Sequence, residues 1–540
     1  MAETMKERKD MDPQYMWDLS TLFKNDEEWN NALPELDEMI KKLPEYQGKL
    51  NNAKTIREFF DFDTHLGRKL SDFYCYASLR NCEDTRDSDA QAMEAKAYQV
   101  YTAYATAISF AEPEILSLDE DVLETIVHSE DLKPYAFNMQ KLLDQKPHVL
   151  SAKEEALLAA FTETLGAPSK ISESLQDADM TFESVTDSNG KVHELNQSNY
   201  ILLQMSEDRT LRLNAFKSFY KGFKQHINTF ASTYNACIKE AVAEAQVRHY
   251  ESSRAMSMAY EHVPGVVYDS LVDTVRKFMP EMYRYVRLRK QMLGLDELHY
   301  YDVYTPLIAG SSKSYTYEEA QQMVLDAVTP LGEDYVNRVK QAYKDRWIDV
   351  YPNNGKRGGA FSSGTYDSNP YILTSFTGTL DSVSTIAHEM GHSQHTWLSN
   401  HTQTPQNADY TLFVAEVAST VNENLLVEQL LQKTTEPKER LALLNHYLEG
   451  FKGTVYRQTM FAEFERDAHA MAERGEAITA ASMNTLYKNL IKDYFGEDLV
   501  IDDEVQYEWA RIPHFYRPFY VYKYATSYCA AVALSEAILN

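Results

Sequence analysis

Residues His388-Glu389-Met390-Gly391-His392 decide the fold prediction for this chain of 540 residues. On an α-helix, residues four apart lie one above the other, so both imidazoles would point the same way. Neutral imidazoles suit Zn²⁺, and an adjacent carboxylate can take a proton from a water held between the rings. The spacing therefore predicts a hydrolytic zinc site. The alternative is a chance match among the 15 histidines of the chain.

The surrounding residues predict a helix over 379–398. This stretch contains no proline, and Asp381 is a suitable N-cap. An apolar face would present the histidines at the edge of a buried helix. That face consists of Val383, Ile386, Ala387 and Met390.

Two residues near the motif need an explanation of their own. Gly391 lowers the helix propensity by about 1 kcal/mol relative to Ala, and close approach of metal, substrate or backbone would explain this cost. His395 follows His392 by three residues on roughly the same face. We expect His395 to pack or to contact a ligand from behind rather than to bind metal.

A catalytic zinc ion needs a third protein ligand and an open position. Residues 411–426 predict a second helix, in which Glu416 interrupts a run of apolar and small residues. Because a buried carboxylate is costly unless it is paired or binds metal, we expect Glu416 to be the third ligand. Glu423 lies on the same face and would contact a metal-binding side chain on the side away from the metal. The alternative for Glu416 is a buried carboxylate bonded to a neighbouring helix.

Both helices resemble those of a known family. HEMGHS at 388–393 and FVAEVASTVNE at 413–423 are similar to the oligoendopeptidase F branch of the thimet oligopeptidase family of zinc metallopeptidases. The segments 17–23, 355–373 and 512–516 resemble that branch too. The resemblance implies one zinc ion per chain, bound by His388, His392 and Glu416, with Glu389 as the general base.

The segment before the zinc helix predicts a substrate-binding strand. Residues 371–376 are typical of a short β-strand, and a glycine-rich turn precedes them. An edge strand can bind an extended peptide through main-chain hydrogen bonds. The alternative is an ordinary hairpin packed on the catalytic helix. The residues expected to contact substrate are Gly359, Ala360, Tyr371, Ile372 and Leu373.

The segment 511–528 supplies candidate donors for the oxyanion of peptide hydrolysis. Pro518 can begin a helix, which would put Tyr520 and Tyr524 on one face and Tyr522 on another. In relatives a histidine and downstream tyrosines contact the transition state, which implies this role for His514, Tyr520 and Tyr524. The spacing here is shorter than in the thimet branch. The alternative is packing, since the chain has 37 tyrosines.

Composition favours a soluble cytoplasmic enzyme. The formal charge of −28 disfavours nucleic acid as a partner, and no apolar stretch has the length of a membrane helix. The first ten residues lack the apolar core of a signal peptide, and the four cysteines lack metal-site spacing. The sequence does not indicate an oligomeric state.

Periodicity predicts a mostly α fold with a small sheet beside the zinc helix. Asn189-Gly190 predicts a two-residue hairpin turn, and a boundary near it gives an N-terminal helical lobe at 1–200 and a catalytic region at 201–540. By resemblance, two helical lobes would enclose a deep channel. Relatives continue with further helix beyond Asn540, so this chain is either a natural short form or truncated. The predicted helical segments are 89–111, 151–165, 207–247, 265–291, 316–344 and 437–472.

We therefore predict a zincin-type, zinc-dependent endopeptidase that hydrolyses internal bonds of short oligopeptides. Zinc and Glu389 would activate the water, and His514 with nearby tyrosines would stabilise the oxyanion. One alternative is a non-catalytic peptide-binding relative with an incompletely assembled site. A third possibility, a zinc hydrolase acting on non-peptide amides, is disfavoured by the strand and by the channel that the resemblance implies.

Overall fold

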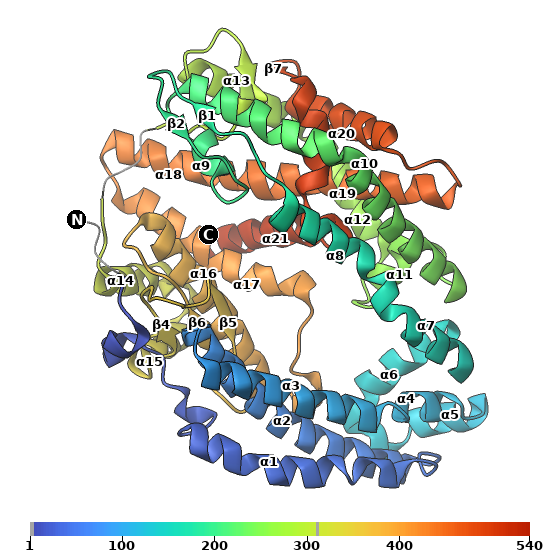
Figure 1. Cartoon of the computed structure of the whole chain (residues 1–540). Coiled ribbons are helices and arrows are strands. Elements are labelled where there is room, and N and C mark those ends of the chain that lie inside the picture. Colours follow the sequence, from blue (N-terminus) through green and yellow to red (C-terminus); the bar gives the residue numbers. More distant parts are fainter. Residues whose placement is uncertain (1–4, 309–312) are drawn as a thin grey trace. The chain divides into compact units, whose positions relative to one another are not determined.

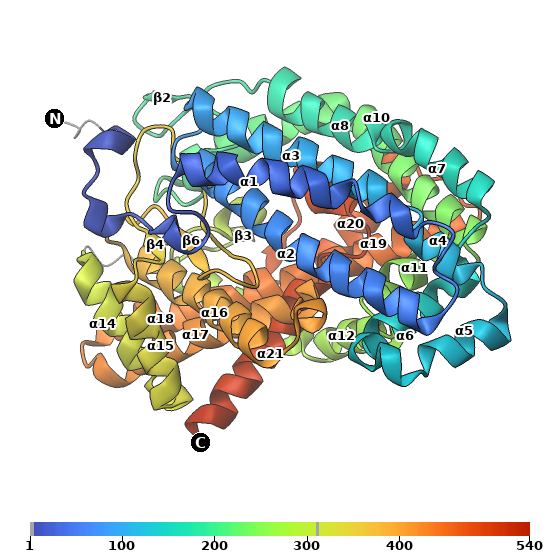
Figure 2. The ribbon, with the colours of Figure 1, turned by 90° about the horizontal axis from the view of Figure 1, so that it is seen from below.

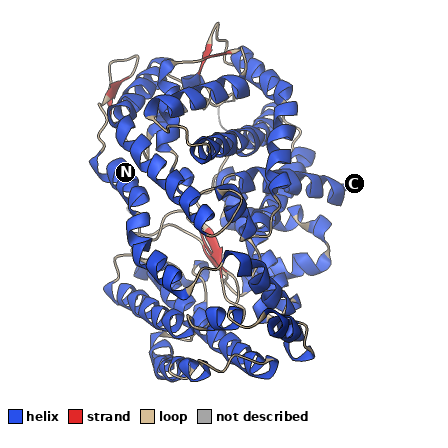
Figure 3. Ribbon diagram, turned by 90° about the vertical axis from the view of Figure 1, so that its right-hand side faces the viewer, coloured by secondary structure: helices blue, strands red, loops and turns tan. Residues whose placement is uncertain are grey.

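The structure, a computed structural model, describes residues 5–308 and 313–540. Helices predominate and the strands are short (Figures 1 and 3), as the sequence predicts. The chain forms two compact units, each assembled from separate parts of the sequence. The first unit comprises Met1–Pro147, Ser312–Lys433 and Ala530–Asn540, and the second comprises His148–Ser311 and Thr434–Cys529. The boundary near residue 200 and the deep channel stay predictions.

Eleven α-helices and one sheet of the described residues lie in the first unit or end there. The early helices are α1 (Asp26–Ile40), α2 (Ala53–Glu83), α3 (Ser88–Ile108), α4 (Ala111–Leu116), α5 (Glu120–Val127) and α6 (Ala136–Gln145). The later elements are α14 (Tyr317–Ala327), α15 (Glu333–Lys344), β4 (Ile348–Asp349), β5 (Phe361–Ser363), β6 (Tyr371–Leu373), α16 (Leu380–Thr402) and α17 (Leu412–Lys433). Helix α21 (Tyr522–Leu539) begins in the second unit and ends in the first.

The second unit contains the remaining described helices. They are α7 (Ala152–Leu165), α8 (Ala167–Ser174), α9 (Tyr200–Gln204), α10 (Arg209–Val247), α11 (Ser253–Ala259), α12 (Gly265–Lys277), α13 (Met279–Met292), α18 (Pro437–Gly450), α19 (Arg457–Glu473) and α20 (Ala480–Phe495). Its strands pair as β1 (Val185–Thr186) with β2 (Val192–His193) and as β3 (Leu298–His299) with β7 (Leu499–Val500).

Most predicted helical segments are present, but three are interrupted. Segment 265–291 breaks where Pro280 opens α13, and segment 316–344 breaks at Pro330 and Gly332. Segment 437–472 contains a π-helical stretch, Phe451–Tyr456. The predicted hairpin is confirmed, but its turn is longer than two residues. The Asp187 carboxylate accepts the backbone N–H groups of Asn189 and Lys191, which closes a wider loop.

Helix α16 carries the His-Glu-Met-Gly-His motif. Its N-cap is Thr379, whose hydroxyl accepts the Ser382 N–H at 3.2 Å, so the prediction of Asp381 as N-cap was wrong. Asp381 instead lies in the first turn, where a negative charge favours the positive end of the helix. The predicted apolar face is confirmed, because all four of its side chains are 0 % exposed.

Helices α16 and α17 lie side by side (Figures 1 and 2). A Cβ atom on Gly391 would lie 2.6 Å from both the Ala418 carbonyl oxygen and the Ser419 Cα, closer than side chains pack. Asn422 Nδ2 also donates to the Ala387 carbonyl at 3.1 Å across the same contact. Backbone approach, one of the three explanations offered for Gly391, is therefore the explanation that the structure gives.

Strand β6 is the central strand of its sheet. It pairs in parallel with β4 and antiparallel with β5. Tyr371 and Leu373 enter one hydrophobic core and Ile372 the other, and each of these three side chains is 0 % exposed. The expectation that β6 is an edge strand was wrong, because a short apolar run is also typical of a strand buried on both faces. Among the described residues, β5 is an outer strand.

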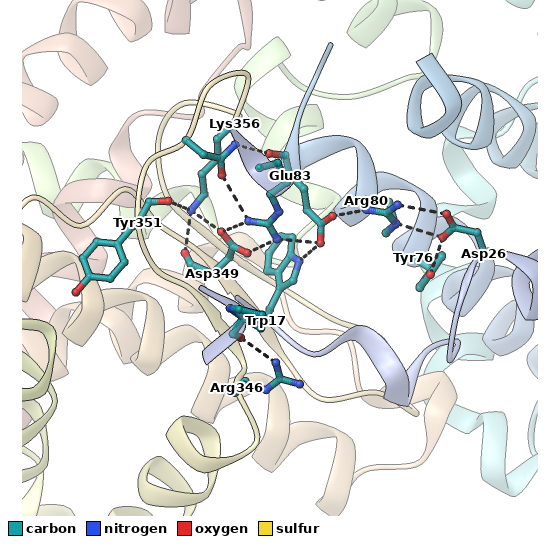
Figure 4. A network of polar contacts seen from close by, with 12 residues as sticks. Trp17, Asp26, Tyr76, Arg80, Glu83, Arg346, Asp349, Tyr351 and Lys356 are labelled. Carbon is teal, nitrogen blue, oxygen red and sulfur yellow. Dashed lines mark hydrogen bonds and ion pairs between the residues drawn. The ribbon is translucent and has the colours of Figure 1, made fainter. Parts of the chain in front are cut away.

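A buried polar network holds the loop before β5 (Figure 4). Arg8 donates to both carboxylate oxygens of Asp349, at 2.9 and 2.6 Å, and Lys356 Nζ lies 2.6 Å from Asp349 Oδ1. Arg8 also lies 3.1 Å from Glu83, which accepts the Trp17 indole N–H at 2.6 Å. Removing one member would leave a buried charge without its partner, which is strongly destabilising.

The same loop closes the C-terminal end of α2. The last carbonyls of a helix lack partners within it. Here Arg357 N–H donates to the Cys82 carbonyl and Asn353 Nδ2 donates to the Glu83 carbonyl, each at 3.0 Å. The loop at 353–357 is therefore fixed by charge pairing and by helix capping.

Replacing Gly391 by alanine should destabilise the first unit, because the added methyl group forces α16 and α17 apart. We expect a loss of about 1–3 kcal/mol in the free energy of unfolding, measured by urea denaturation. Gly67 in α2 is a matched control, since a Cβ there meets nothing within 4 Å. Gly67→Ala should be neutral or stabilising. An equal response of both variants would contradict this account of the helix contact.

Candidate metal centre and catalytic residues

Three side chains from α16 and α17 converge on one point in the first unit. The atoms are His388 Nε2, His392 Nε2 and one carboxylate oxygen of Glu416, and all lie within 4.8 Å of one another. The two Nε2 atoms are 3.2 Å apart, and Glu416 Oε2 is 3.4 Å from the first and 3.5 Å from the second. Helical spacing aligns the imidazoles, and the contact at Gly391 brings α17 close enough for Glu416 to reach them.

Glu423 fixes how His388 presents its ring. Its carboxylate lies 2.7 Å from His388 Nδ1, and an ionised carboxylate can only accept a hydrogen bond. His388 Nδ1 therefore carries a proton, so whenever the ring is neutral its Nε2 lone pair is directed at the cluster. The sequence predicts this arrangement, in which Glu423 contacts a candidate metal ligand on the side away from the metal.

The side chains of the cluster shift one another's pKa values. Burial lowers the pKa of His388, but hydrogen bonds to Glu416 and Glu423 outweigh this effect and raise that pKa to about 10. Hydrogen bonds from His388 and His392 hold the pKa of Glu416 well below its usual range, although burial opposes them. Ser419 Oγ also donates to Glu416 Oε2 at 2.9 Å. Glu416 is therefore a carboxylate that stays charged.

Glu389 is buried beside the cluster and is 6 % exposed. Its Oε2 atom has no hydrogen-bond partner among the described residues. Burial raises the pKa of Glu389, and the nearby histidines only partly oppose this. A carboxylate with a raised pKa is a better proton acceptor, which suits a general base.

His395 does not join the cluster. Its ring stacks on Tyr410, with centroids 3.7 Å apart and an interplanar angle of 14°. Burial lowers the pKa of His395, which favours the neutral ring. The packing alternative for His395 therefore agrees with the structure.

The donor set fits a zinc ion. Two imidazole nitrogens and one carboxylate oxygen are the usual ligands of a catalytic zinc site, which keeps its fourth position open. Two facing Nε2 atoms 3.2 Å apart cannot both point lone pairs at each other favourably. A proton or a metal ion between these groups relieves the repulsion.

The sheet contacts α16 directly. Ser362 in β5 and Ser393 in α16 share a hydrogen bond of 2.8 Å between their hydroxyl groups. Gly359, with φ of +86°, and Ala360 lead into β5 and are not buried. Tyr371, Ile372 and Leu373 lie behind β5 in the core. Sequence reasoning missed Ser362 and Ser393, because only the fold brings them together.

The remaining candidates form a separate group in the second unit. The ring of His514 lies 6.1 Å from the rings of both Tyr520 and Tyr524, and Tyr524 O–H donates to the Tyr520 oxygen at 3.2 Å. Burial and the charge of Arg517 lower the pKa of His514, so its ring is neutral near pH 7. The helix begins at Tyr522 and not at Pro518, because Phe519 has a φ of +57°. Tyr522 is buried in the core.

The helix pair and its donor set define the class as a metallopeptidase with a His-Glu-x-x-His motif. Residues 202–540 match the profile of Peptidase family M3, and residues 114–182 match that described as Oligopeptidase F. The chain belongs to peptidase family M3 and is a metallo-oligopeptidase. No helix within the described ranges is both long and apolar enough to cross a membrane.

Curated relatives match almost the whole chain. Oligopeptidase PepF of Bacillus subtilis is 43 % identical over 541 residues, covering 100 % of this chain and 81 % of the relative. Group B oligopeptidase PepB of Streptococcus agalactiae is 41 % identical, covering 99 % of this chain and 89 % of the relative.

Solved structures agree with this family. A crystal structure described as a putative peptidase from Chlamydophila abortus has a TM-score of 0.92 at 34 % identity, covering 99 % of this chain and 91 % of that one. Oligoendopeptidase-F from Enterococcus faecium has a TM-score of 0.72 at 36 % identity, covering 95 % and 88 %.

Zinc affinity should decrease as the pH is lowered, because metal binding must displace the proton that the metal-free cluster holds. His388, with a raised pKa of about 10, is protonated below that pH, so acidification favours the metal-free state. We expect the affinity to fall about tenfold for each pH unit between pH 8 and 6, measured by competition with a chelator.

Glu423→Gln should weaken this pH dependence, since it removes one of the carboxylates that raise the pKa of His388. Glu428→Gln, five residues later on α17, is the matched control and should behave as the unaltered chain does. An affinity that stays constant from pH 8 to pH 6 would contradict the proton competition.

Proposed function

We propose that this chain is a zinc-dependent endopeptidase that hydrolyses internal bonds of short oligopeptides in the cytoplasm. The observation that carries the proposal is the convergence of His388 Nε2, His392 Nε2 and Glu416 Oε2 next to the buried Glu389. These three residues would hold one zinc ion per chain. Bound there, zinc would supply a Lewis acid that polarises a carbonyl and makes a water molecule more acidic.

Glu389 moves the proton in this mechanism. It takes a proton from the water whose oxygen attacks the peptide carbonyl carbon. It then delivers this proton to the amide nitrogen as the carbon–nitrogen bond breaks, so the amine leaves uncharged. The raised pKa of Glu389, which burial causes, suits this role, because a carboxylate with a raised pKa is a better proton acceptor.

His514, Tyr520 and Tyr524 are proposed as donors to the oxyanion. Two phenol hydroxyls and a neutral imidazole N–H can each donate a hydrogen bond to an oxygen that gains negative charge. Their mutual contacts in the second unit support a shared role. A neutral His514 is the form that donates without bringing a full positive charge.

The substrate peptide is proposed to extend β5. The outer edge of this strand offers main-chain groups, and Gly359 and Ala360 give it an open approach. Main-chain pairing supplies affinity with little demand on side chains, so we expect broad sequence preference. Tyr371, Ile372 and Leu373 support β5 from the core rather than touching the peptide. Ser362, bonded to Ser393, fixes the strand relative to the zinc helix.

A peptide library tests the central proposal. The purified chain should make internal cuts in short peptides, lose this activity to a chelator and regain it with added zinc. Glu389→Gln should lower kcat by about 10²–10⁴-fold or more while zinc stays bound, because only the proton acceptor is lost. Zinc content is measured by metal analysis of the same samples.

The control for Glu389→Gln is Asp381→Asn, an equivalent change at an exposed residue of the same helix. It should keep nearly full activity. Turnover retained by Glu389→Gln would refute its role as general base. Peptide binding without any cleavage by the zinc-loaded chain would favour a non-catalytic relative instead.

Tyr520→Phe and Tyr524→Phe test the oxyanion donors. Removing one hydroxyl should lower kcat by about 10²–10³-fold with a smaller change in KM, since the donor acts mainly in the transition state. Tyr260→Phe is the control, because Tyr260 is 78 % exposed in the same unit. Equal kcat values for all three variants would exclude both hydroxyls from the mechanism.

A further inference from the structure

The turn before Tyr520 adopts an unfavourable backbone conformation. Phe519 has a φ of +57°, in the left-handed region that a bulky side chain rarely adopts. Such a residue persists only where its surroundings hold it, and it marks positions where geometry serves function. Phe519 directly precedes one of the proposed oxyanion donors.

A buried carboxyl group holds this turn. Glu465 Oε1 accepts the Phe519 backbone N–H at 2.8 Å, and Glu465, on α19, is 0 % exposed. Its other oxygen, Oε2, has no hydrogen-bond partner among the described residues. Burial raises the pKa of Glu465 well above its usual range, and the Phe519 N–H and the charge of Lys523 only partly oppose this. Glu465 therefore accepts this hydrogen bond in surroundings that favour its uncharged form.

Neighbouring groups hold the same turn from other sides. The Phe519 ring is 1 % exposed and lies against His469, four residues after Glu465 on α19, and against Tyr268. Their ring centroids are 4.7 and 5.9 Å from that of Phe519. From α11, Ser257 Oγ donates to the Pro518 carbonyl at 2.8 Å.

The turn determines where Tyr520 points. Before it, Arg517 N–H donates to the His514 carbonyl at 2.9 Å, which folds the chain back at this residue. After it, Tyr520 and Tyr524 meet through their hydroxyls at 3.2 Å. A negative φ at Phe519 would redirect the following residue, so the three rings would no longer gather.

A contribution to folding stability does not explain why position 465 carries an acidic residue. A buried carboxyl group costs free energy unless it is paired. Within the described residues, Glu465 accepts the Phe519 N–H and forms no ion pair. Lys523, whose positive charge acts on Glu465, pairs instead with Glu261 at 2.8 Å. An apolar side chain would fill the space but could not accept the Phe519 N–H.

We propose that Glu465 is a positioning residue of the active site, which holds the left-handed turn at Phe519 and thereby sets the Tyr520 hydroxyl beside His514 and Tyr524. This inference rests on the proposed function, because it assigns Glu465 a role through the oxyanion donors. Glu465 does not itself touch the substrate. It supplies the acceptor that keeps Phe519 in its unfavourable conformation.

Two substitutions separate the acceptor from the volume of the side chain. Glu465→Gln keeps an uncharged acceptor, and Glu465→Met keeps the length without one. Glu465→Met should lower kcat at least tenfold, with KM and zinc content nearly unchanged, while Glu465→Gln should stay within about threefold of the unaltered enzyme. Leu490→Ala, at a buried site on α20, controls for general destabilisation of the second unit and should keep its kcat below its melting temperature.

A second measurement does not depend on activity. With 3-fluorotyrosine incorporated at position 520, the ¹⁹F resonance should shift or broaden in Glu465→Met and stay in place in Glu465→Gln and Leu490→Ala. An unchanged resonance in Glu465→Met would overturn the proposal, as would a Glu465→Gln enzyme as impaired as Glu465→Met. Should Glu465→Met not fold, a Glu465→Gln enzyme with normal kcat and resonance supports the proposal, and an impaired one overturns it.

A double-mutant cycle tells this proposal apart from the proposed function. If Glu465 acts through Tyr520, the pair Glu465→Met and Tyr520→Phe should be no slower than Tyr520→Phe alone. Fully additive losses would overturn the positioning role. If Tyr520→Phe alone leaves kcat unchanged, the oxyanion role fails, and the ¹⁹F resonance still decides whether Glu465 holds the turn.

Discussion

The backbone contact between α16 and α17 at Gly391 is the constraint on which the metal centre depends. A Cβ at this position would meet the backbone of Ala418 and Ser419 at 2.6 Å, so only glycine allows this approach. The contact lies two to three residues after Glu416 on α17 and one before His392 on α16. It therefore determines how closely Glu416 approaches the imidazoles. Gly391 lowers the helix propensity of α16, but it allows the three candidate ligands to lie at one point.

These groups lie so close that they would repel one another without a proton or a cation among them. Two imidazole nitrogens and a carboxylate oxygen lie 3.2–3.5 Å apart, and Glu423 adds a further carboxylate behind His388. Protons relieve this arrangement in the metal-free chain, and a divalent cation would relieve it more completely. Buried apolar residues of α16 and the hydrogen bond from Asn422 to the Ala387 carbonyl hold α16 and α17 together at this cluster. The packing between α16 and α17 thus maintains the close spacing of the side chains in the cluster.

The sequence predicts those parts of the structure that depend on local spacing. The two helices follow from periodicity, and an isolated Glu416 among small residues is a signal that burial makes costly. The edge position assigned to β6 failed because an apolar run does not reveal whether one or both faces are covered. The Asp349 network and the Ser362–Ser393 bond join residues far apart in the chain, and no local pattern contains them. The φ of Phe519 was equally hidden, because its cause is Glu465, which lies 54 residues earlier.

Three carboxyl groups at or near the site have different pKa shifts because their partners differ. Removal from water acts to raise the pKa of Glu389, of the half-buried Glu416 and of Glu465. Two histidines reverse this effect at Glu416 and keep it ionised, as its proposed role as a metal ligand requires. At Glu465 the Phe519 N–H and the charge of Lys523 oppose burial only in part, so its pKa lies well above the usual range. Glu389 lies between these cases, because the charges of two nearby imidazoles oppose the effect of burial only in part. This intermediate environment suits the proposed role of a group that takes and returns a proton.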